Sequence, residues 1–194
     1  MYIHDEHNFG FIAHPKTASS ATQRVLRAMG AKLYGHHHEY RKEWCHPILD
    51  SGGIIMSTIR NPFDLFVSWY FHYAARRPDQ PMEPFKEWLA NQIAHPNNYM
   101  EDGLFWGLPL TNRVLRFEHL QRDFNNVLEE MGLGPQHIET FNVSLRREGR
   151  PYQVMYDTES IHLIQEAHAD LLADHGYSFE EIPDGADATQ EGDS

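Results

Sequence analysis

The sequence has only one cysteine, Cys45, among its 194 residues. A single thiol cannot form an intramolecular disulfide, and such sparing use of cysteine is typical of proteins from reducing compartments. Basic residues are also in the minority: 16 lysines and arginines stand against 28 aspartates and glutamates, which gives a formal net charge of −12. A chain this acidic is poorly suited to bind nucleic acid or an anionic membrane, and we expect neither as a partner.

Long apolar runs are missing too. No stretch approaches the roughly 20 apolar residues of a membrane-spanning helix, and the first residues lack the pattern of a signal peptide. We therefore expect a soluble, cytoplasmic protein. The length suits a single domain with a substantial core, which we place at residues 1–179. Residues 180–194 contain six acidic residues and no basic one, which predicts a disordered acidic tail.

A polar loop near the N-terminus joins two apolar patterns. Phe9–Ala13 is a short apolar run that predicts a buried strand, and the helical periodicity after residue 20 predicts a helix that ends at Gly30. The loop between them consists of Lys16, Thr17, Ala18, Ser19 and Ser20. Free backbone N–H groups at a helix N-terminus attract a phosphate, and a lysine adds a full positive charge. The loop is therefore a candidate anion site, with a simple polar helix cap as the alternative.

A second strand–helix junction follows at residues 54–70. Ile54–Ile59 is a nearly continuous apolar run, which is typical of a strand buried in a parallel sheet. Asn61 is a good N-cap and Pro62 a good first helical residue, so Arg60 lies at the carboxyl end of the strand. Ligands of open α/β sheets bind at that end, and an arginine binds phosphate through two N–H groups. Arg60 therefore marks a second candidate phosphate site, unless it forms only a surface ion pair.

The two junctions together resemble the nucleotide-binding motifs of sulfotransferases that use 3′-phosphoadenosine 5′-phosphosulfate (PAPS). In a Walker A loop, Gly-x-x-x-x-Gly-Lys-Ser/Thr, the lysine comes after the glycines. Here the lysine comes first in the loop and no glycine follows it, so this is not a Walker A loop. It is similar instead to the family's Pro-Lys-Thr/Ser-Gly-Thr-Thr/Ser loop. Arg60-Asn-Pro-x-Asp-x-x-x-Ser68-x-Tyr resembles the 3′-phosphate motif, in which an arginine and a serine eight residues later hold that phosphate. The resemblance implies that residues 16–20 bind the 5′-phosphosulfate, while Arg60 and Ser68 bind the 3′-phosphate.

A basic segment late in the chain resembles the loop with which many sulfotransferases close over the 3′-phosphate. The residues that carry this resemblance are Arg147, Gly149 and Arg150. Glu148 departs from the pattern, because it stands where a cation is expected. A solvated basic loop is the alternative explanation.

A run of histidines lies between the two phosphate motifs. Tyr34–His46 contains three consecutive histidines, His36, His37 and His38. Three interpretations of this run are open: one histidine acts as a general base, several bind a metal ion, or all lie on a solvated loop. The metal site is the least favoured, because neighbouring residues on an extended chain do not easily converge on one metal ion. The family resemblance implies a general base here, for which we rank His36 and His37 ahead of His38, with Glu39 and Glu43 behind.

The remaining segments are expected to complete the domain. Residues 76–112 are rich in proline and carry aromatic residues, which predicts either a helical cover of the sheet or a lid that binds the acceptor. Arg113–Leu120 predicts a strand that enters a helix, with Glu118 in a structural role. Asp157 or Thr158 is expected to cap one long helix that ends at Gly176.

The resemblance implies an α/β fold of the three-layer P-loop-NTPase-like kind, with a central, mainly parallel sheet flanked by helices. It implies transfer of the sulfuryl group from PAPS to a hydroxyl or amine of a carbohydrate or small-molecule acceptor. The product is 3′-phosphoadenosine 5′-phosphate (PAP), and no metal is required. Two other functions remain open: a small-molecule or nucleotide kinase of similar fold, and a protein that binds PAP without catalysis.

Overall fold

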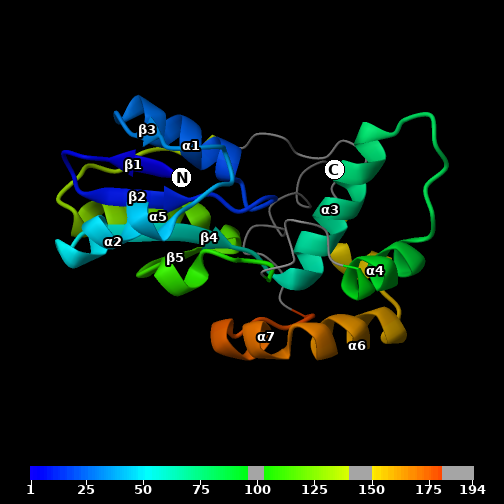
Figure 1. The fold of residues 1–194 in the computed structure, drawn as a ribbon. Coiled ribbons are helices and arrows are strands. Elements are labelled where there is room, and N and C mark those ends of the chain that lie inside the picture. Colours follow the sequence, from blue (N-terminus) through cyan, green and yellow to red (C-terminus); the bar gives the residue numbers. More distant parts are fainter. Residues whose placement is uncertain (96–102, 140–149, 181–194) are drawn as a thin grey trace, which may run out of the picture.

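The computed structural model describes residues 1–95, 103–139 and 150–180, which form an α/β fold (Figure 1). Their sheet has five strands in the order β3-β1-β2-β4-β5. The strands are β1 (Tyr2–His4), β2 (Phe9–Ile12), β3 (Lys32–Leu33), β4 (Ile54–Ile59) and β5 (Arg113–Arg116). The predicted acidic tail lies outside the described residues, apart from Glu180.

The sheet is mixed, so the prediction of a mainly parallel sheet was wrong. Strands β2, β4 and β5 are parallel, whereas β1 is antiparallel to both β2 and β3. The cause is the short connection between β1 and β2. Only four residues, 5–8, join these strands, and so short a link permits only an antiparallel pair.

Seven α-helices surround the sheet or extend beyond it in the described part of the chain. They are α1 (Ser19–Ala28), α2 (Lys42–Asp50), α3 (Pro62–Arg76), α4 (Phe85–Ala94), α5 (Leu120–Glu130), α6 (Thr158–Ala167) and α7 (Ala169–His175). Figure 1 shows α1, α2 and α5 against the sheet, while α3, α4, α6 and α7 gather beyond the carboxyl ends of the strands. The clear three-layer arrangement that we predicted is therefore not present.

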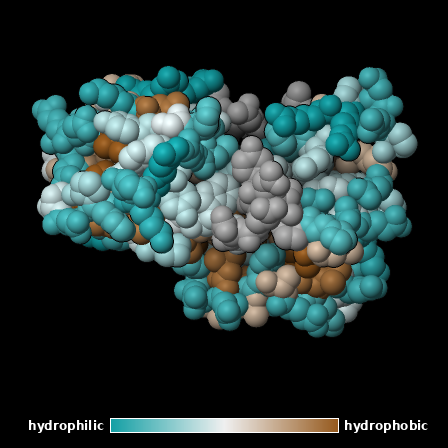
Figure 2. All heavy atoms as spheres, viewed as in Figure 1, coloured by the Kyte–Doolittle hydropathy of each residue, from teal (hydrophilic) through white to brown (hydrophobic). Residues whose placement is uncertain are grey.

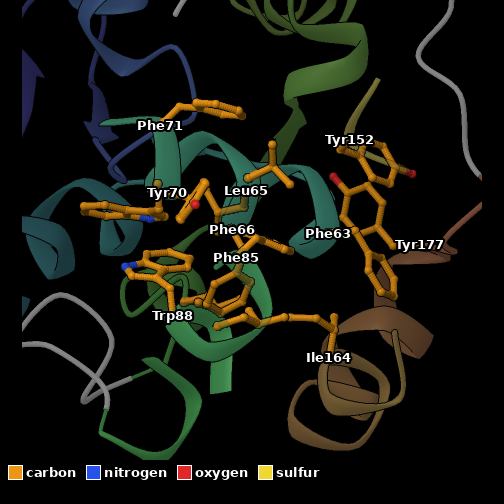
Figure 3. Packing of buried hydrophobic residues seen from close by; sticks show 14 of the residues in the cluster. Phe63, Leu65, Phe66, Tyr70, Phe71, Phe85, Trp88, Tyr152, Ile164 and Tyr177 are labelled. Carbon is orange, nitrogen blue, oxygen red and sulfur yellow. The ribbon is translucent and has the colours of Figure 1, made fainter. Parts of the chain in front are cut away.

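The buried apolar residues form separate clusters on the sheet and in the helical group. Phe11, Leu26 and Phe124 pack between the sheet, α1 and α5, while Ile12 and Ile48 pack on the side of α2. Figure 3 shows the largest cluster, in which aromatic rings of α3 meet those of α4 and the C-terminal segments. Burying this much aromatic area dominates the stability of such a core. The start of α3 thus connects the sheet with the helical group.

Several element boundaries agree with the sequence analysis. Strand β4 covers Ile54–Ile59 as predicted, and the side chain of Asn61 caps α3 by accepting the N–H of Phe63 at 3.1 Å. Asp157 caps α6 through a reciprocal pair of hydrogen bonds with Ser160. The single long helix after Asp157 was wrong, because the chain breaks at His168 and continues as α7. The ring of His168 lies 5.6 Å from that of Phe66, in the aromatic cluster.

The face of the molecule in Figure 2 is largely hydrophilic, with small apolar patches over the α6–α7 region among others. Among the described residues, the large hydrophobic side chains that are exposed are Leu33, Met82, Val114 and Val154. None of the described helices combines the length and apolar character that crossing a bilayer requires.

Candidate functional site

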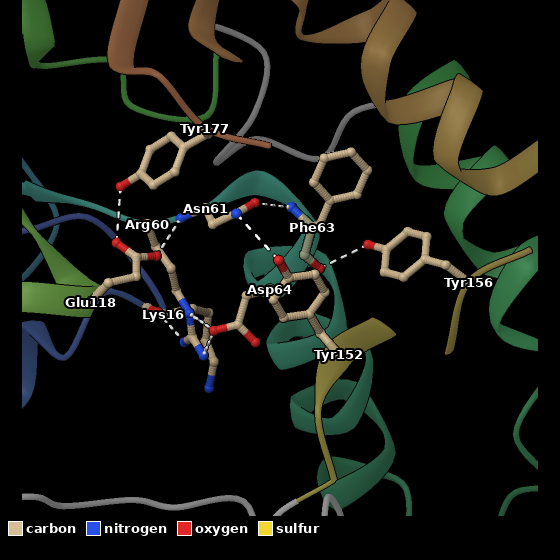
Figure 4. A network of polar contacts seen from close by, with 9 residues as sticks. All are labelled: Lys16, Arg60, Asn61, Phe63, Asp64, Glu118, Tyr152, Tyr156 and Tyr177. Carbon is tan, nitrogen blue, oxygen red and sulfur yellow. Dashed lines mark hydrogen bonds and ion pairs between the residues drawn. The ribbon is translucent and has the colours of Figure 1, made fainter. Parts of the chain in front are cut away.

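Two loops meet at the carboxyl ends of β2 and β4. These strands are parallel neighbours, with Ile12 opposite Ser57, so the chain leaves both at the same edge of the sheet. One N–H of the Arg60 guanidinium, at Nη1, donates to the backbone carbonyl of Lys16 at 2.7 Å (Figure 4). The sheet therefore places the Lys16 loop and the Arg60 loop in direct contact, which is the arrangement that binding one nucleotide through both loops requires.

The loop from Lys16 to Ser20 combines an unusual backbone conformation with N–H groups that have no acceptor in the described residues. Lys16 and Ala18 have left-handed backbone angles, with φ of 63° and 57°. Within the described residues, none of the five N–H groups of this loop donates a hydrogen bond to the protein. Successive free N–H groups in such a turn, at the start of α1, form a concave anion-binding nest.

The side chains of this loop have different roles. Thr17 is fully buried, and its hydroxyl donates to the carbonyl of His14 at 2.9 Å, which stabilises the turn from within. Ser19 is buried and Ser20 exposed. Among these side chains, Lys16 contributes the positive charge and Thr17 the shape of the turn.

Lys16 carries a half-buried ammonium group without a counter-charge. In the residues that the structure describes, no carboxylate lies within ion-pair distance of its Nζ. The pKa of Lys16 is lowered to about 8, mainly by burial and in addition by the charges of Arg60 and Arg76. A bound phosphate or sulfate would remove this repulsion, so the site is electrostatically suited to an anion.

Arg60 is buried and already makes several contacts. Its Nε and Nη2 both donate to Oδ2 of Asp64, at 2.8 and 2.6 Å, and its Cζ lies 3.9 Å from the centre of the Phe117 ring. Together with the bond to Lys16, these contacts use three of the five N–H groups of the guanidinium. One N–H at Nη1 and one at Nη2 remain for a ligand, while the other contacts hold the loop in place. Ser68 is half-buried two turns into α3.

The start of α3 is fixed by a polar network (Figure 4). Glu118 accepts the backbone N–H of Asn61 at 2.7 Å and the hydroxyl of Tyr177 at 3.0 Å. Burial raises the pKa of Tyr177, and the neighbouring Glu118 carboxylate adds to this shift, so the phenol stays a donor. Tyr156 donates to the carbonyl of Phe63 at 2.8 Å. Glu118 therefore has the structural role that the sequence predicts for it.

The structure separates the three histidines of the predicted base region. His36 and His37 are exposed, whereas His38 is half-buried and its Nδ1 donates to the carbonyl of Ala13 at 2.8 Å. Ala13 ends the apolar run that leads into the Lys16 loop, so His38 contacts the chain three residues before Lys16. Burial lowers the pKa of His38, which keeps the imidazole neutral. The described residues contain no cluster of three or more groups that could hold a metal ion.

His14 belongs to the site and was missed in the sequence analysis. It is fully buried, and its Nδ1 donates to the carbonyl of Thr58 at 3.1 Å, while its Nε2 has no hydrogen-bond partner among the residues that the structure describes. The rings of Phe105 and Trp106 each lie 5.3 Å from its ring. These two aromatic residues of the predicted lid therefore cover the strand ends beside Lys16. The sequence does contain one indication that His14 belongs to the site, because His14 directly precedes Pro15-Lys16.

We expect His14 to make the fold sensitive to acid. Burial lowers its pKa to about 4, from 6.5 in an unfolded chain. Its stabilising effect is therefore complete above pH 6.5 and is lost as pH falls toward 4, because only the unfolded state binds the proton. The loss is on the order of 3 kcal/mol. Urea unfolding from pH 7 to 4 should show a shallower decline in stability for His14→Gln than for His46→Gln, an exposed control on α2; equal slopes contradict the prediction.

Ala18 stands where the resembling loop pattern has glycine, and its φ of 57° favours glycine. Left-handed backbone costs an ordinary residue about 1–2 kcal/mol. We expect Ala18→Gly to raise the free energy of unfolding by about 1 kcal/mol and the melting temperature by about 2–4 °C. Ala28→Gly, on the exposed face of right-handed α1, should instead lower stability by about 0.5 kcal/mol. Destabilisation by both changes, in thermal unfolding, would contradict this account.

The late basic loop is only partly visible. Arg147 and Gly149 lie outside the described residues, and Arg150 is exposed.

Comparison with models of known protein families gives no match, and no curated protein matches the sequence. The chemistry of the site is therefore inferred from its own geometry.

Proposed function

We propose that the chain is a PAPS-dependent sulfotransferase, which moves the sulfuryl group to a hydroxyl or amine of a carbohydrate or small-molecule acceptor. The observation that carries the proposal is the contact between two loops. At one strand end lie the free N–H groups of residues 16–20 and the Lys16 ammonium, which has no carboxylate partner in the described part of the chain. At the next strand end lies Arg60, whose guanidinium donates to the backbone carbonyl of Lys16. The β2–α1 and β4–α3 units are, in this proposal, the nucleotide-binding half of a P-loop-like fold, and the compartment is the cytoplasm.

The proposed roles follow from charge and position. PAPS supplies an activated sulfuryl group, whose transfer depends mainly on alignment and on stabilising charge. The nest formed by residues 16–20 binds the 5′-phosphosulfate, and Lys16 stabilises the negative charge that develops on the leaving oxygen. Arg60, through its two remaining N–H groups, and Ser68 bind the 3′-phosphate, with Arg147, Gly149 and Arg150 as the proposed closing loop. None of these roles needs a metal ion.

The general base is assigned to the histidine run, with His38 ahead of His36 and His37. His38 contacts the carbonyl that precedes the Lys16 loop, and its Nδ1 is a donor, which leaves Nε2 as the basic nitrogen. A neutral imidazole accepts the proton of the attacking hydroxyl. Turnover should fall most in His38→Ala at saturating acceptor. Wild-type rates in His36→Ala, His37→Ala and His38→Ala alike would exclude this region as the base.

The function can be tested by ligand-dependent stability. PAP at a hundredfold excess over its dissociation constant should stabilise the protein by about 2.7 kcal/mol, which is a shift of about 5–10 °C in melting temperature. Stabilisation by ATP–Mg²⁺ but not by PAP would favour a kinase. Binding of PAP without sulfate transfer to any of a panel of sugars, phenols and amines would favour a non-catalytic PAP-binding protein.

The proposed nucleotide site itself is tested with Arg60→Ala, because unchanged PAP binding by this variant, in calorimetry, would contradict it.

A further inference from the structure

Helix α3 carries a line of polar and basic residues that starts at the site. Ser68, His72 and Arg76 follow one another at intervals of four residues, so they share one face of the helix. Asp64, one step earlier in the same series, is the residue that binds Arg60. The line therefore begins beside the Arg60–Lys16 contact and continues along α3.

This line has positive charge without a matching negative charge. His72 and Arg76 lie one turn apart on the same face of α3. The charges of Lys16 and Arg76 both act on His72, and the charge of Arg76 also acts on Lys16. Within the described residues, neither Lys16 nor Arg76 has a carboxylate within ion-pair distance. Asp64 is occupied by Arg60, and other basic residues such as Lys86 and Arg113 do have acidic partners. Gathered cations without counter-ions are the usual mark of an anion site.

We propose that Ser68, His72 and Arg76 extend the Lys16–Arg60 site into a strip that binds the phosphate groups of the donor nucleotide, and that His72 takes up a proton when they bind. The inference rests on the proposed function, and it adds two binding residues and a proton that enters with the ligand. In the free protein, burial and then the charges of Lys16 and Arg76 lower the pKa of His72. A phosphate dianion in the strip reverses the sign of the local field, so the imidazole gains a proton.

The chain offers matched controls for both residues. Arg77 follows Arg76 directly, but it is the C-cap of α3 and lies outside the four-residue series, and its Cζ lies 5.7 Å from the centre of the Tyr73 ring. His162 is an exposed histidine on α6. Arg76→Gln is therefore compared with Arg77→Gln, and His72→Gln with His162→Gln. His72, Arg76 and His162 lie on helices and Arg77 lies at the C-cap of α3, all at partly or fully exposed sites. Circular dichroism and thermal unfolding can therefore verify that each variant folds.

The test is calorimetric titration with PAP at pH 6.5, in two buffers that differ in ionisation enthalpy. At this pH Lys16, with a pKa of about 8, is already protonated. The phosphate groups of PAP also titrate near pH 6, so the uptake assigned to His72 is the difference between wild type and His72→Gln. We expect Arg76→Gln to weaken PAP binding about tenfold or more, since a charged hydrogen bond is lost, and Arg77→Gln to change it less than twofold. Proton uptake should fall in His72→Gln and stay unchanged in His162→Gln.

The outcomes separate this inference from the proposed function. If PAP binds but Arg76→Gln and Arg77→Gln bind it equally well, or if proton uptake is the same in His72→Gln as in wild type, the strip is wrong and the donor site stands. If PAP fails to bind while inorganic tripolyphosphate binds and depends on Arg76, the strip stands and the sulfotransferase assignment is wrong. If neither probe binds the wild-type protein, both proposals are overturned.

Discussion

Replacement of Lys16 by alanine is expected to reduce sulfuryl transfer from PAPS by about a hundredfold or more. The ammonium is half-buried at the strand ends, has no carboxylate partner among the described residues, and lies beside a nest of free N–H groups. Removing one charge that stabilises a transition state typically costs a factor of 10²–10³ in rate. The measurement is the turnover number at saturating PAPS and acceptor, together with PAP affinity by calorimetry.

The control for Lys16→Ala is Lys32→Ala. Lys32 lies on β3, and its ion pair with Asp5, at 3.4 Å, is exposed to solvent. Such a pair contributes little, so neither turnover nor stability should change noticeably. Because Lys16 makes no ion pair in the described residues, Lys16→Ala should also keep near-wild-type stability, and lost activity would then reflect the site itself. A Lys16→Ala enzyme within threefold of wild-type turnover would contradict the proposed role.

The junction between β4 and α3 was predictable from the sequence because all its signals are local. The six residues Ile54–Ile59, four of them apolar, form the buried strand, and Asn61-Pro62 starts the helix by capping geometry that depends only on adjacent residues. The capping box at Asp157 is local in the same way. The parallel pairing of β2 with β4 then places Lys16 and Arg60 at one edge, as the spacing of the two motifs implied.

Features that depend on distant contacts were not predictable in this way. Strand β1 is only three residues long, and its antiparallel pairing with β2 and β3 is fixed by partners rather than by its own pattern. At the break between α6 and α7, the ring of His168 packs near that of Phe66, which lies about a hundred residues away in the sequence. Likewise, the partial burial of His38 and its contact with the carbonyl of Ala13 distinguish it from the two exposed histidines before it, and both depend on residues far away in the sequence.

One strong interaction at the site was visible in the sequence and was overlooked. Arg60 and Asp64 are four residues apart across the start of a helix, which is the spacing at which side chains meet. Their ion pair explains why Arg60 is only 7% exposed, although it was expected to bind a phosphate directly. The arginine therefore has two functions in our account, since it holds the Lys16 loop and offers its remaining N–H groups to the ligand.

Asp64→Asn is expected to destabilise the fold by about 3–5 kcal/mol, because it leaves the buried Arg60 guanidinium without its counter-charge. Both side chains are buried, at 9% and 4% exposure, and the carboxylate accepts two N–H groups of Arg60. The matched control is Glu130→Gln, which breaks the ion pair with Arg113 at 43% and 40% exposure and should cost less than about 1 kcal/mol. Urea unfolding measures both changes. Equal losses of unfolding free energy would show that the buried Arg60–Asp64 pair contributes no more to stability than an exposed ion pair.

The same variant tests whether Arg60 binds phosphate. In Asp64→Asn the guanidinium has lost its carboxylate, so a phosphate that binds Arg60 becomes its replacement partner. PAP should therefore raise the melting temperature of Asp64→Asn by more than that of wild type, because the ligand now also satisfies a buried charge. In Glu130→Gln the PAP-induced shift should equal that of wild type. A smaller shift in Asp64→Asn than in wild type would mean that Arg60 acts only through the loop that it holds, and that the 3′-phosphate is bound elsewhere.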